Sequence, residues 1–389
     1  MTAAALPVDT RLFTDIQRFG AADVSACFSC GVCTATCPLA GEDASFPRRM
    51  IRYAEVGLRG KLLASPELWS CYACGECSES CPTQAEPSEF MAAARRYAIA
   101  SYDRTGLARL MYTHPLVGAL IAVALAAFFA LFMYANRGPM SGSTLDIFGF
   151  VPEGLIHDSG VVVMIAIFLA GLTGLATMAR AVARQNGVKM RSLVAGRASL
   201  GHAIASAWHA LAVESLGQRR YRADCESDSA VPWYRQRWLV HALTMWGFLG
   251  LLLATVLDYG LALAGIKATG TPVPIWYPVR LLGTLAGLAL VYGTSALMWR
   301  RLRRADRSVR KSSAADWTFL ILLLVTGLTG FALEIGLYLP QPPAWGYWMF
   351  LFHVAVAMEL VLLAPFVKFA HAVYRPLALF FLSLTAKEA

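Results

Sequence analysis

Six long apolar stretches constrain the possible folds of this chain more than any other feature. They occupy residues 116–136, 158–179, 238–260, 278–299, 316–338 and 346–373. Each reaches about the 20 residues that a helix needs to cross a bilayer, and a spanning helix satisfies its own backbone hydrogen bonds. A buried core helix is the alternative for any single stretch. Because the whole chain is 57% apolar and 15% charged, six such stretches predict a multi-pass membrane protein.

The positive charges are distributed unevenly between the two sides of these spans. Ten Lys and Arg residues lie between the second and third spans, from Arg180 to Arg237, and seven lie between the fourth and fifth. The opposite loops contain only Arg137 and Lys267. Because cytoplasmic loops carry the Lys/Arg excess, we expect a cytoplasmic (inner) membrane protein with both termini in the cytoplasm. The net charge of +9 then reflects topology, and no nucleic-acid partner is expected.

The cysteines form two runs with the same spacing. Residues 27–38 read CFSCGVCTATCP and residues 71–82 read CYACGECSESCP, which is C-x2-C-x2-C-x3-C-P twice; only Cys225 lies elsewhere. Disulfides are one alternative, but the chain starts without the apolar core of a secretory signal. Zinc is another, but structural zinc sites use separated ligand pairs. The spacing is typical of [4Fe–4S] clusters, so we expect two of them in a cytoplasmic domain over residues 1–112.

The fourth cysteine of this motif ligates the other cluster in two-cluster ferredoxins. This crossing assigns four cysteines to each cluster. The first cluster is expected on Cys27, Cys30, Cys33 and Cys81, and the second on Cys71, Cys74, Cys77 and Cys37.

Three histidines lie in or beside the spans. His353 and His371 are eighteen residues apart in the last apolar stretch, and His241 begins the third. If the last stretch were one helix, about 100° per residue would put both histidines on one face, about 27 Å apart. Histidines inside membrane spans are costly and usually functional. Two imidazoles at two membrane depths indicate haem ligands.

A segment outside the six spans has the pattern of an amphipathic helix. Residues 199–216 read SLGHAIASAWHALAVESL, and their apolar side chains recur at helical spacing at Leu200, Ile204, Trp208 and Leu211. We expect this helix to lie in the inner membrane interface. His202 and His209 share one of its faces, either as interfacial or domain-contacting side chains or as ligands.

The histidine-containing helices resemble a known family. FHVAVAMELVLLAPFVKFAHAVYRP is similar to the last helix of the gamma subunit of respiratory nitrate reductase, and WLVHALTMWGFLGL is similar to its partner helix. The resemblance implies an inner b haem on His241 and His371. Lys368 either pairs with a haem propionate or extends toward the interface.

The resemblance is incomplete at the outer haem. The family has a second histidine ten residues after the first on the partner helix, where this chain has Leu251. His353 therefore either ligates a second haem with an unusual partner such as His157, or donates a hydrogen bond to a quinone. In the second case Glu359 and Glu334 are candidates for proton relay.

The cysteine-rich part resembles the small iron–sulfur subunit of heterodisulfide reductase. Its fusion to a cytochrome-b-like part resembles the membrane subunit of the quinone-interacting membrane-bound oxidoreductase. The implied fold is mainly α, a helical two-cluster ferredoxin-like domain followed by a six-helix transmembrane cytochrome b bundle over residues 113–389.

The implied function is electron transfer in a membrane-bound quinone oxidoreductase complex. The chain would pass electrons between cytoplasmic flavin or heterodisulfide-reductase-like subunits and the quinone pool, through two [4Fe–4S] clusters and b haem. A redox-linked proton pump or transporter is the alternative, because Asp258, Glu334 and Glu359 lie within or at the ends of spans. A purely structural membrane anchor is a third interpretation.

Overall fold

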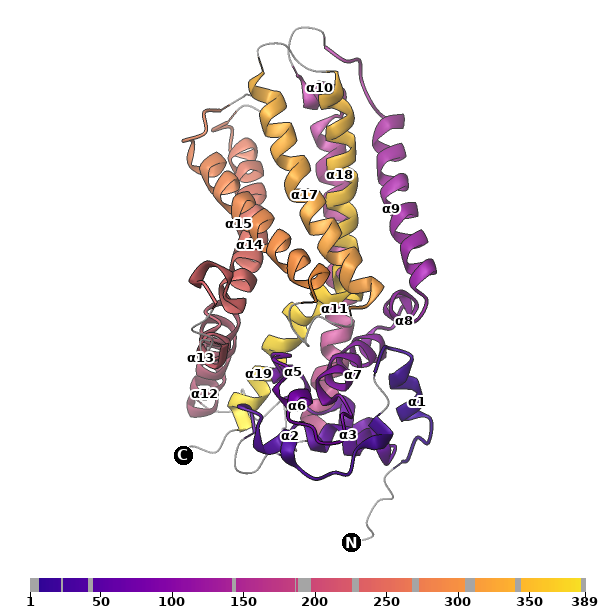
Figure 1. Cartoon of the computed structure of the whole chain (residues 1–389). Coiled ribbons are helices and arrows are strands. Elements are labelled where there is room, and N and C mark those ends of the chain that lie inside the picture. Colours follow the sequence, from indigo (N-terminus) through magenta and orange to yellow (C-terminus); the bar gives the residue numbers. More distant parts are fainter. Residues whose placement is uncertain are drawn as a thin grey trace.

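The computed structural model describes residues 7–21, 24–40, 45–141, 145–185, 187, 197–225, 231–267, 273–304, 312–339 and 344–385. Within these residues every regular element is a helix, and no strand occurs. The short N-terminal helices gather at one end of a bundle of long helices (Figure 1). The mainly α fold class predicted from the sequence is therefore confirmed.

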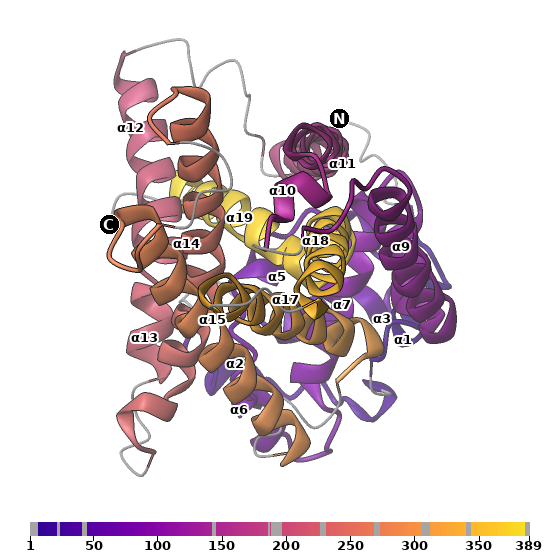
Figure 2. The same ribbon diagram turned by 90° about the horizontal axis from the view of Figure 1, so that it is seen from above.

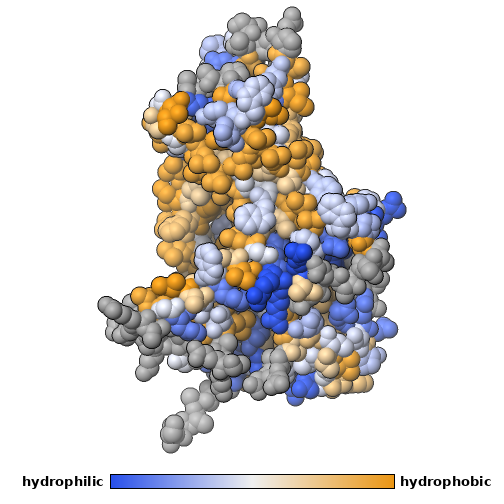
Figure 3. All heavy atoms as spheres, turned by 90° about the vertical axis from the view of Figure 1, so that its left-hand side faces the viewer, coloured by the Kyte–Doolittle hydropathy of each residue, from blue (hydrophilic) through white to orange (hydrophobic). Residues whose placement is uncertain are grey.

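Six helices are long and apolar enough to cross a membrane. They are α9 Pro115–Ala135, α11 Glu153–Gln185, α14 Arg237–Leu263, α15 Pro278–Leu302, α17 Ala314–Tyr338 and α18 Trp345–Leu363. Figure 3 shows mainly hydrophobic residues over the middle and upper part of one face and strongly hydrophilic residues gathered below them. Six membrane-length helices are thus confirmed, and the first five match predicted spans as single helices.

The long helices form a closely packed pair and a larger group. α14 and α15 pack along much of their length, and α15 also contacts α17, which leads to the group of α9, α11, α17 and α18 (Figure 2). Close approach requires glycine at Gly247, where an added Cβ would lie 2.5 Å from the Leu290 backbone nitrogen. Small residues at such crossings let membrane helices pack backbone against backbone.

The last apolar stretch is not one helix, so this prediction was wrong. α18 ends at Leu363 and is followed by the short segments η5 Ala364–Phe366 and η6 Lys368–Ala370, after which α19 runs from His371 to Thr385. Pro365 explains the break, because proline has no N–H to donate and its ring clashes with the preceding turn. His353 and His371 therefore lie on different helices, and the one-face argument does not hold. α19 leaves the bundle at an angle (Figure 1).

The segment between the second and third spans is helical. α12 Arg197–Trp208 continues into the π-helical segment η3 His209–Leu216, and α13 Arg219–Cys225 and η4 Trp233–Arg235 follow. α12 is seen side-on when the bundle is viewed from above (Figure 2). Its predicted apolar stripe is exposed, with 61% of Ile204 and 69% of Trp208 accessible. The membrane-interface position of this helix stays a prediction.

The N-terminal helices pack on the lower ends of the bundle. They are α1 Leu12–Gln17, η1 Val24–Ala26, α2 Val32–Ala35, α3 Arg48–Glu55, α4 Arg59–Leu63, α5 Glu67–Ser70, α6 Glu76–Glu79, α7 Pro87–Tyr102 and α8 Leu107–Thr113. One apolar core joins them to α11 and α19, and includes the rings of Trp69 and Tyr374, which pack at a tilt with their centres 5.2 Å apart. The cysteine-rich part is therefore fixed against α19 rather than tethered by a linker.

A buried ion network ties the two parts together. Asp316 near the start of α17 is 4% exposed and lies 3.3 Å from Arg96 of α7 and 3.3 Å from Lys368 of η6. Arg96 also donates a hydrogen bond to the Phe19 carbonyl oxygen at 2.7 Å. One carboxylate thus neutralises cations from the N-terminal part and from the segment that precedes His371.

Removing this carboxylate should destabilise the protein. We expect Asp316→Asn to lower the free energy of unfolding by about 3 kcal/mol, because a buried guanidinium loses its counter-charge. Thermal unfolding of the purified protein measures the change. The control is Glu55→Gln, which breaks the surface pair with Arg52 and should change the free energy by less than about 1 kcal/mol. Equal effects of the two substitutions would contradict the role of Asp316.

Candidate metal centres

The two cysteine runs adopt the same backbone conformation. Gly31 and Gly75 have φ of 90° and 97°, and Ser29 and Ala73, two residues earlier, have φ of 54° and 55°. A positive φ is easily accessible to glycine and strained for other residues. In both runs a short helix, α2 or α6, follows the glycine and carries the third cysteine. The repeated sequence therefore builds two copies of one loop.

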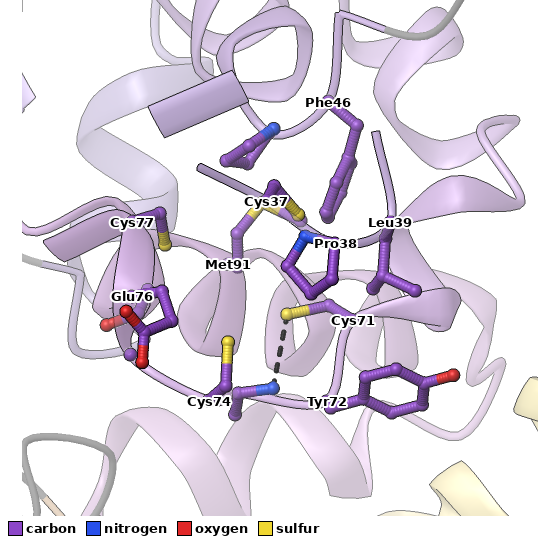
Figure 4. A pocket seen from close by; sticks show the side chains of 14 residues that line it. Cys37, Pro38, Leu39, Phe46, Cys71, Tyr72, Cys74, Glu76, Cys77 and Met91 are labelled. Carbon is purple, nitrogen blue, oxygen red and sulfur yellow. Dashed lines mark hydrogen bonds between the residues drawn. The ribbon is translucent and has the colours of Figure 1, made fainter. Parts of the chain in front are cut away.

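The last cysteine of the first run joins the first three cysteines of the second. One pocket is lined by Cys37, Cys71, Cys74 and Cys77, and Figure 4 shows their sulfur atoms around a common space. The backbone N–H of Ala73 donates a hydrogen bond to the Cys71 sulfur at 3.3 Å. The structure thus brings together the four side chains assigned to the second cluster.

The remaining cysteines group around Cys33. The pKa of the buried Cys33 thiol is raised by burial and by its neighbours Cys27, Cys30 and Cys81. Cys30 is exposed, whereas Cys33 is buried. These are the four side chains assigned to the first cluster, and this group is the more open to solvent at Cys30.

Burial also controls the protonation of the cysteine group assigned to the second cluster. Burial, with a smaller contribution from the neighbouring Cys71 and Cys74, raises the pKa of the Cys37 thiol to about 11. Buried thiols of this kind are protonated at neutral pH until a metal displaces the proton. Among the described residues, no three His, Cys, Asp or Glu side chains are close enough to hold a single metal ion. A [4Fe–4S] cube would hold four cysteines at its separate corners.

His241 near the start of α14 and His371 at the start of α19 lie beside each other. Their ring centres are 6.2 Å apart. With metal–nitrogen bonds of about 2 Å, two imidazoles on opposite sides of one metal ion have their centres about 6 Å apart. His241 Nδ1 donates to the Gln218 side-chain oxygen at 3.2 Å, and His371 Nδ1 donates to the Lys368 carbonyl oxygen at 2.5 Å. Both Nε2 atoms are then available as ligands, and second partners of this kind fix a ligating ring.

His353, the outer histidine, has no second imidazole beside it among the described residues. His353 Nδ1 lies 2.8 Å from the Thr329 hydroxyl, and within the described ranges no second imidazole stacks near its ring. His157 instead stacks on Tyr259, with ring centres 3.7 Å apart, and lies 3.3 Å from Glu153. The structure therefore does not bring His353 and His157 together.

The acidic residues of the spans differ in their surroundings. Glu334 accepts hydrogen bonds from Arg280 at 3.0 Å and from Thr284 at 3.1 Å, and Asp258 pairs with Lys267. Glu359 is 2% exposed, and its Oε1 has no hydrogen-bond partner among the described residues. Paired carboxylates are poor proton carriers, so Glu359 is the stronger candidate for proton relay.

Other predicted residues have ordinary contacts. Lys368 pairs with Asp316, as described above. His202 lies 3.4 Å from the Leu384 carbonyl oxygen, and His209 lies 3.7 Å from Glu214. Neither of these two histidines has a second imidazole beside it in the described part of the chain, which favours structural contacts over ligation.

Sequence reasoning missed several residues at these sites. Gln218 and Tyr221 contact His241, and Tyr72 contacts Tyr221, although none of the three belongs to a motif that marks a ligand. Of these three residues, only Tyr72 could have been suspected from the sequence, because it stands inside the second cysteine run directly after Cys71.

The fold and the two cysteine groups define a multi-pass membrane protein with an N-terminal two-cluster iron–sulfur domain. Residues 23–85 match the 4Fe-4S dicluster domain model, and residues 104–389 match the family model described as Citrate utilization protein B. Because the second match covers most of the chain, the protein belongs to the Citrate utilization protein B family.

Curated relatives support both assignments. The chain is 35% identical to Citrate utilization protein B of Escherichia coli over 175 residues, which is 44% of this chain and 44% of that protein. It is 34% identical to one subunit of the H(2):CoB-CoM heterodisulfide,ferredoxin reductase of Methanothermobacter thermautotrophicus over 62 residues, which is 16% of this chain and 34% of that relative. The matches thus span less than half the length of either relative. No solved structure matches the chain.

These comparisons confirm part of the family resemblance. The iron–sulfur part is similar to a heterodisulfide reductase subunit, and the protein has a redox role in electron transfer. The membrane part matches a different family from the one that the histidine helices resemble. Similarity to the nitrate reductase gamma subunit and to the quinone-interacting membrane-bound oxidoreductase stays a prediction.

Proposed function

We propose that this protein carries electrons between a cytoplasmic redox partner and membrane quinone. The observation that carries the proposal is that two four-cysteine groups lie at the end of the membrane bundle where His241 and His371 pack together. Cytoplasmic flavin or heterodisulfide-reductase-like subunits are the proposed donors or acceptors on one side. The quinone pool is the proposed acceptor or donor on the other.

We assign the cysteines to two [4Fe–4S] clusters with crossed ligation. Cys37 lies with the second run in one pocket, and Cys81 lies beside Cys33 of the first. Bound clusters would supply one-electron redox chemistry. The chain contributes the thiolate ligands, the buried surroundings and backbone N–H donors to the sulfurs.

We assign His241 and His371 to one b haem. The ring separation and the two Nδ1 partners would let both histidines hold such a group through Nε2. Gln218 and the Lys368 carbonyl oxygen hold the two rings in orientation. Because Lys368 and Arg375 flank His371 in the sequence, their positive charges suit the propionates of such a group.

We orient the protein with both termini and the cluster domain (residues 1–112) in the cytoplasm of a cell with an inner membrane. The Lys/Arg excess of the loops next to the cysteine-rich end supports this orientation. The haem domain is then residues 113–389. The packing of the cysteine-rich part against α19 supports a placement of haem and clusters on the same side.

Metal analysis of the purified protein tests the proposal. We expect about eight cluster irons and one b haem per chain. Paramagnetic resonance of the reduced protein should show two interacting clusters. A protein with bound zinc in place of iron, or without haem absorbance, would contradict the assignment.

We propose that His353 faces a quinone rather than a second haem. It lacks a second imidazole and lies on α18, the helix that also carries the buried Glu359. Imidazole can donate a hydrogen bond to a quinone carbonyl oxygen and can transfer a proton to it.

His353→Ala should keep the haem and lower the rate of quinone reduction by about 100-fold, because general acid catalysis is lost. Stopped-flow reoxidation by a soluble quinone gives the rate. His157→Ala, an outer histidine stacked on Tyr259, is the matched control and should leave the rate unchanged. Two haems per chain, with one lost in His353→Ala, would exclude the quinone role.

A further inference from the structure

Two tyrosine rings lie in a row between the second cysteine group and the paired histidines. Tyr72 directly follows Cys71 in the loop that lines the pocket of the second cysteine group. Its ring centre is 5.3 Å from that of Tyr221 on α13, and Tyr221 is 5.6 Å from His241. His241 is in turn 6.2 Å from His371. A continuous series of aromatic contacts thus joins one cysteine group to both histidines.

The membrane part holds the Tyr72 loop in place. The Arg375 guanidinium of α19 lies 4.7 Å from the centre of the Tyr72 ring, and Arg237 at the start of α14 donates to the Cys74 carbonyl oxygen at 3.3 Å. Arg95 of α7 donates to the Cys71 carbonyl oxygen at 2.9 Å. Cation–π contacts and charged hydrogen bonds of this kind fix a loop more firmly than apolar contact alone. The position of Tyr72 is therefore set by the same helices that carry His241 and His371.

The first cysteine run provides an internal comparison. Phe28 occupies the position that Tyr72 occupies in the second run, and the two loops have the same backbone conformation. Phe28 is 81% exposed. Two copies of one loop therefore present this side chain differently, one to solvent and one to the histidines.

We propose that Tyr72 and Tyr221 form the electron-transfer contact between the cluster on Cys37, Cys71, Cys74 and Cys77 and the haem on His241 and His371. The inference rests on the proposed function. Each transfer moves one electron, so that the donor centre is oxidised and the acceptor centre reduced by one electron, and no bond or proton changes. Packed atoms transmit electronic coupling better than a solvent- or lipid-filled gap. Neither tyrosine would bind a redox centre itself. Tyr72 acts through its sequence neighbour Cys71, and Tyr221 acts through its ring contact with His241, so both are positioning residues.

The rate of electron transfer in the purified full-length protein tests this inference. The clusters are reduced by a light flash, and haem reduction is followed optically. We expect Tyr221→Leu to slow haem reduction several-fold with unchanged cluster signals, haem content and midpoint potentials. Tyr221→Phe keeps the ring and should keep the rate. The matched control is Phe28→Leu, at the equivalent but exposed position, which should also keep the rate.

A second measurement tests the contact without the redox centres. Photo-oxidation of the wild-type protein should yield a dityrosine cross-link between the peptides that contain Tyr72 and Tyr221, and Tyr221→Phe should abolish it. An unchanged rate in Tyr221→Leu, or the absence of the cross-link, would overturn the inference. A wild-type protein that binds no haem would instead overturn the proposed function.

Discussion

Replacing His371 with alanine should abolish the b-type absorbance of the purified protein while both cluster signals persist. His371 lies 6.2 Å from His241 and begins α19, so no neighbouring histidine among the described residues can take its place as a ligand. A haem held by both histidines would lose one of its two protein ligands in this variant. We expect haem content to fall from one per chain to near zero, and His241→Ala should have the same effect.

His209→Ala is the matched control for this substitution. His209 lies on the neighbouring η3 segment and contacts Glu214 rather than a second imidazole. Its replacement should leave the haem spectrum unchanged. Full haem content in both His241→Ala and His371→Ala would exclude the proposed haem ligands.

Replacing Cys81 with serine should damage the cluster that is otherwise held by Cys27, Cys30 and Cys33. The physical reason is the crossed arrangement, in which Cys81 lies beside the first run although the second run contains it. Serine is a poor ligand for iron in this setting, because soft thiolates are the preferred ligands of iron–sulfur clusters. We expect paramagnetic resonance to show the loss or conversion of one cluster and an intact signal from the other.

Two further variants complete this test. Cys37→Ser should damage the other cluster, because Cys37 lies in the pocket of the second run. Cys225→Ser changes the ninth cysteine and should affect neither cluster. If Cys81→Ser removed the cluster of its sequence neighbours instead, crossed ligation would be wrong.

The membrane helices were predictable because length and apolar composition determine spanning helices almost alone. The six predicted stretches match helices within a few residues at most boundaries. The exception is the last stretch, where a strong apolar signal concealed the local effect of Pro365. Hydropathy is insensitive to a lost backbone donor, and the consequence is that His371 belongs to a separate helix.

The cysteine groups were also predictable, because one local motif determines both the loop conformation and the crossing. The pairing of His241 with His371 came from a family resemblance, and the structure now gives it a geometry. In contrast, the contacts of Asp316 with Arg96 and of Tyr72 with Tyr221 join residues far apart in the sequence. They depend on how the cysteine-rich part packs against the bundle, which no local pattern encodes.

The most direct test of the proposed function is a single optical and paramagnetic titration of the purified protein. The protein is first fully reduced with a low-potential donor, and an oxidised quinone is then added. We expect that the haem absorbance of the reduced state disappears and that both cluster signals are lost as the quinone is reduced. A haem-free protein, or clusters that stay reduced in the presence of excess quinone, would contradict it.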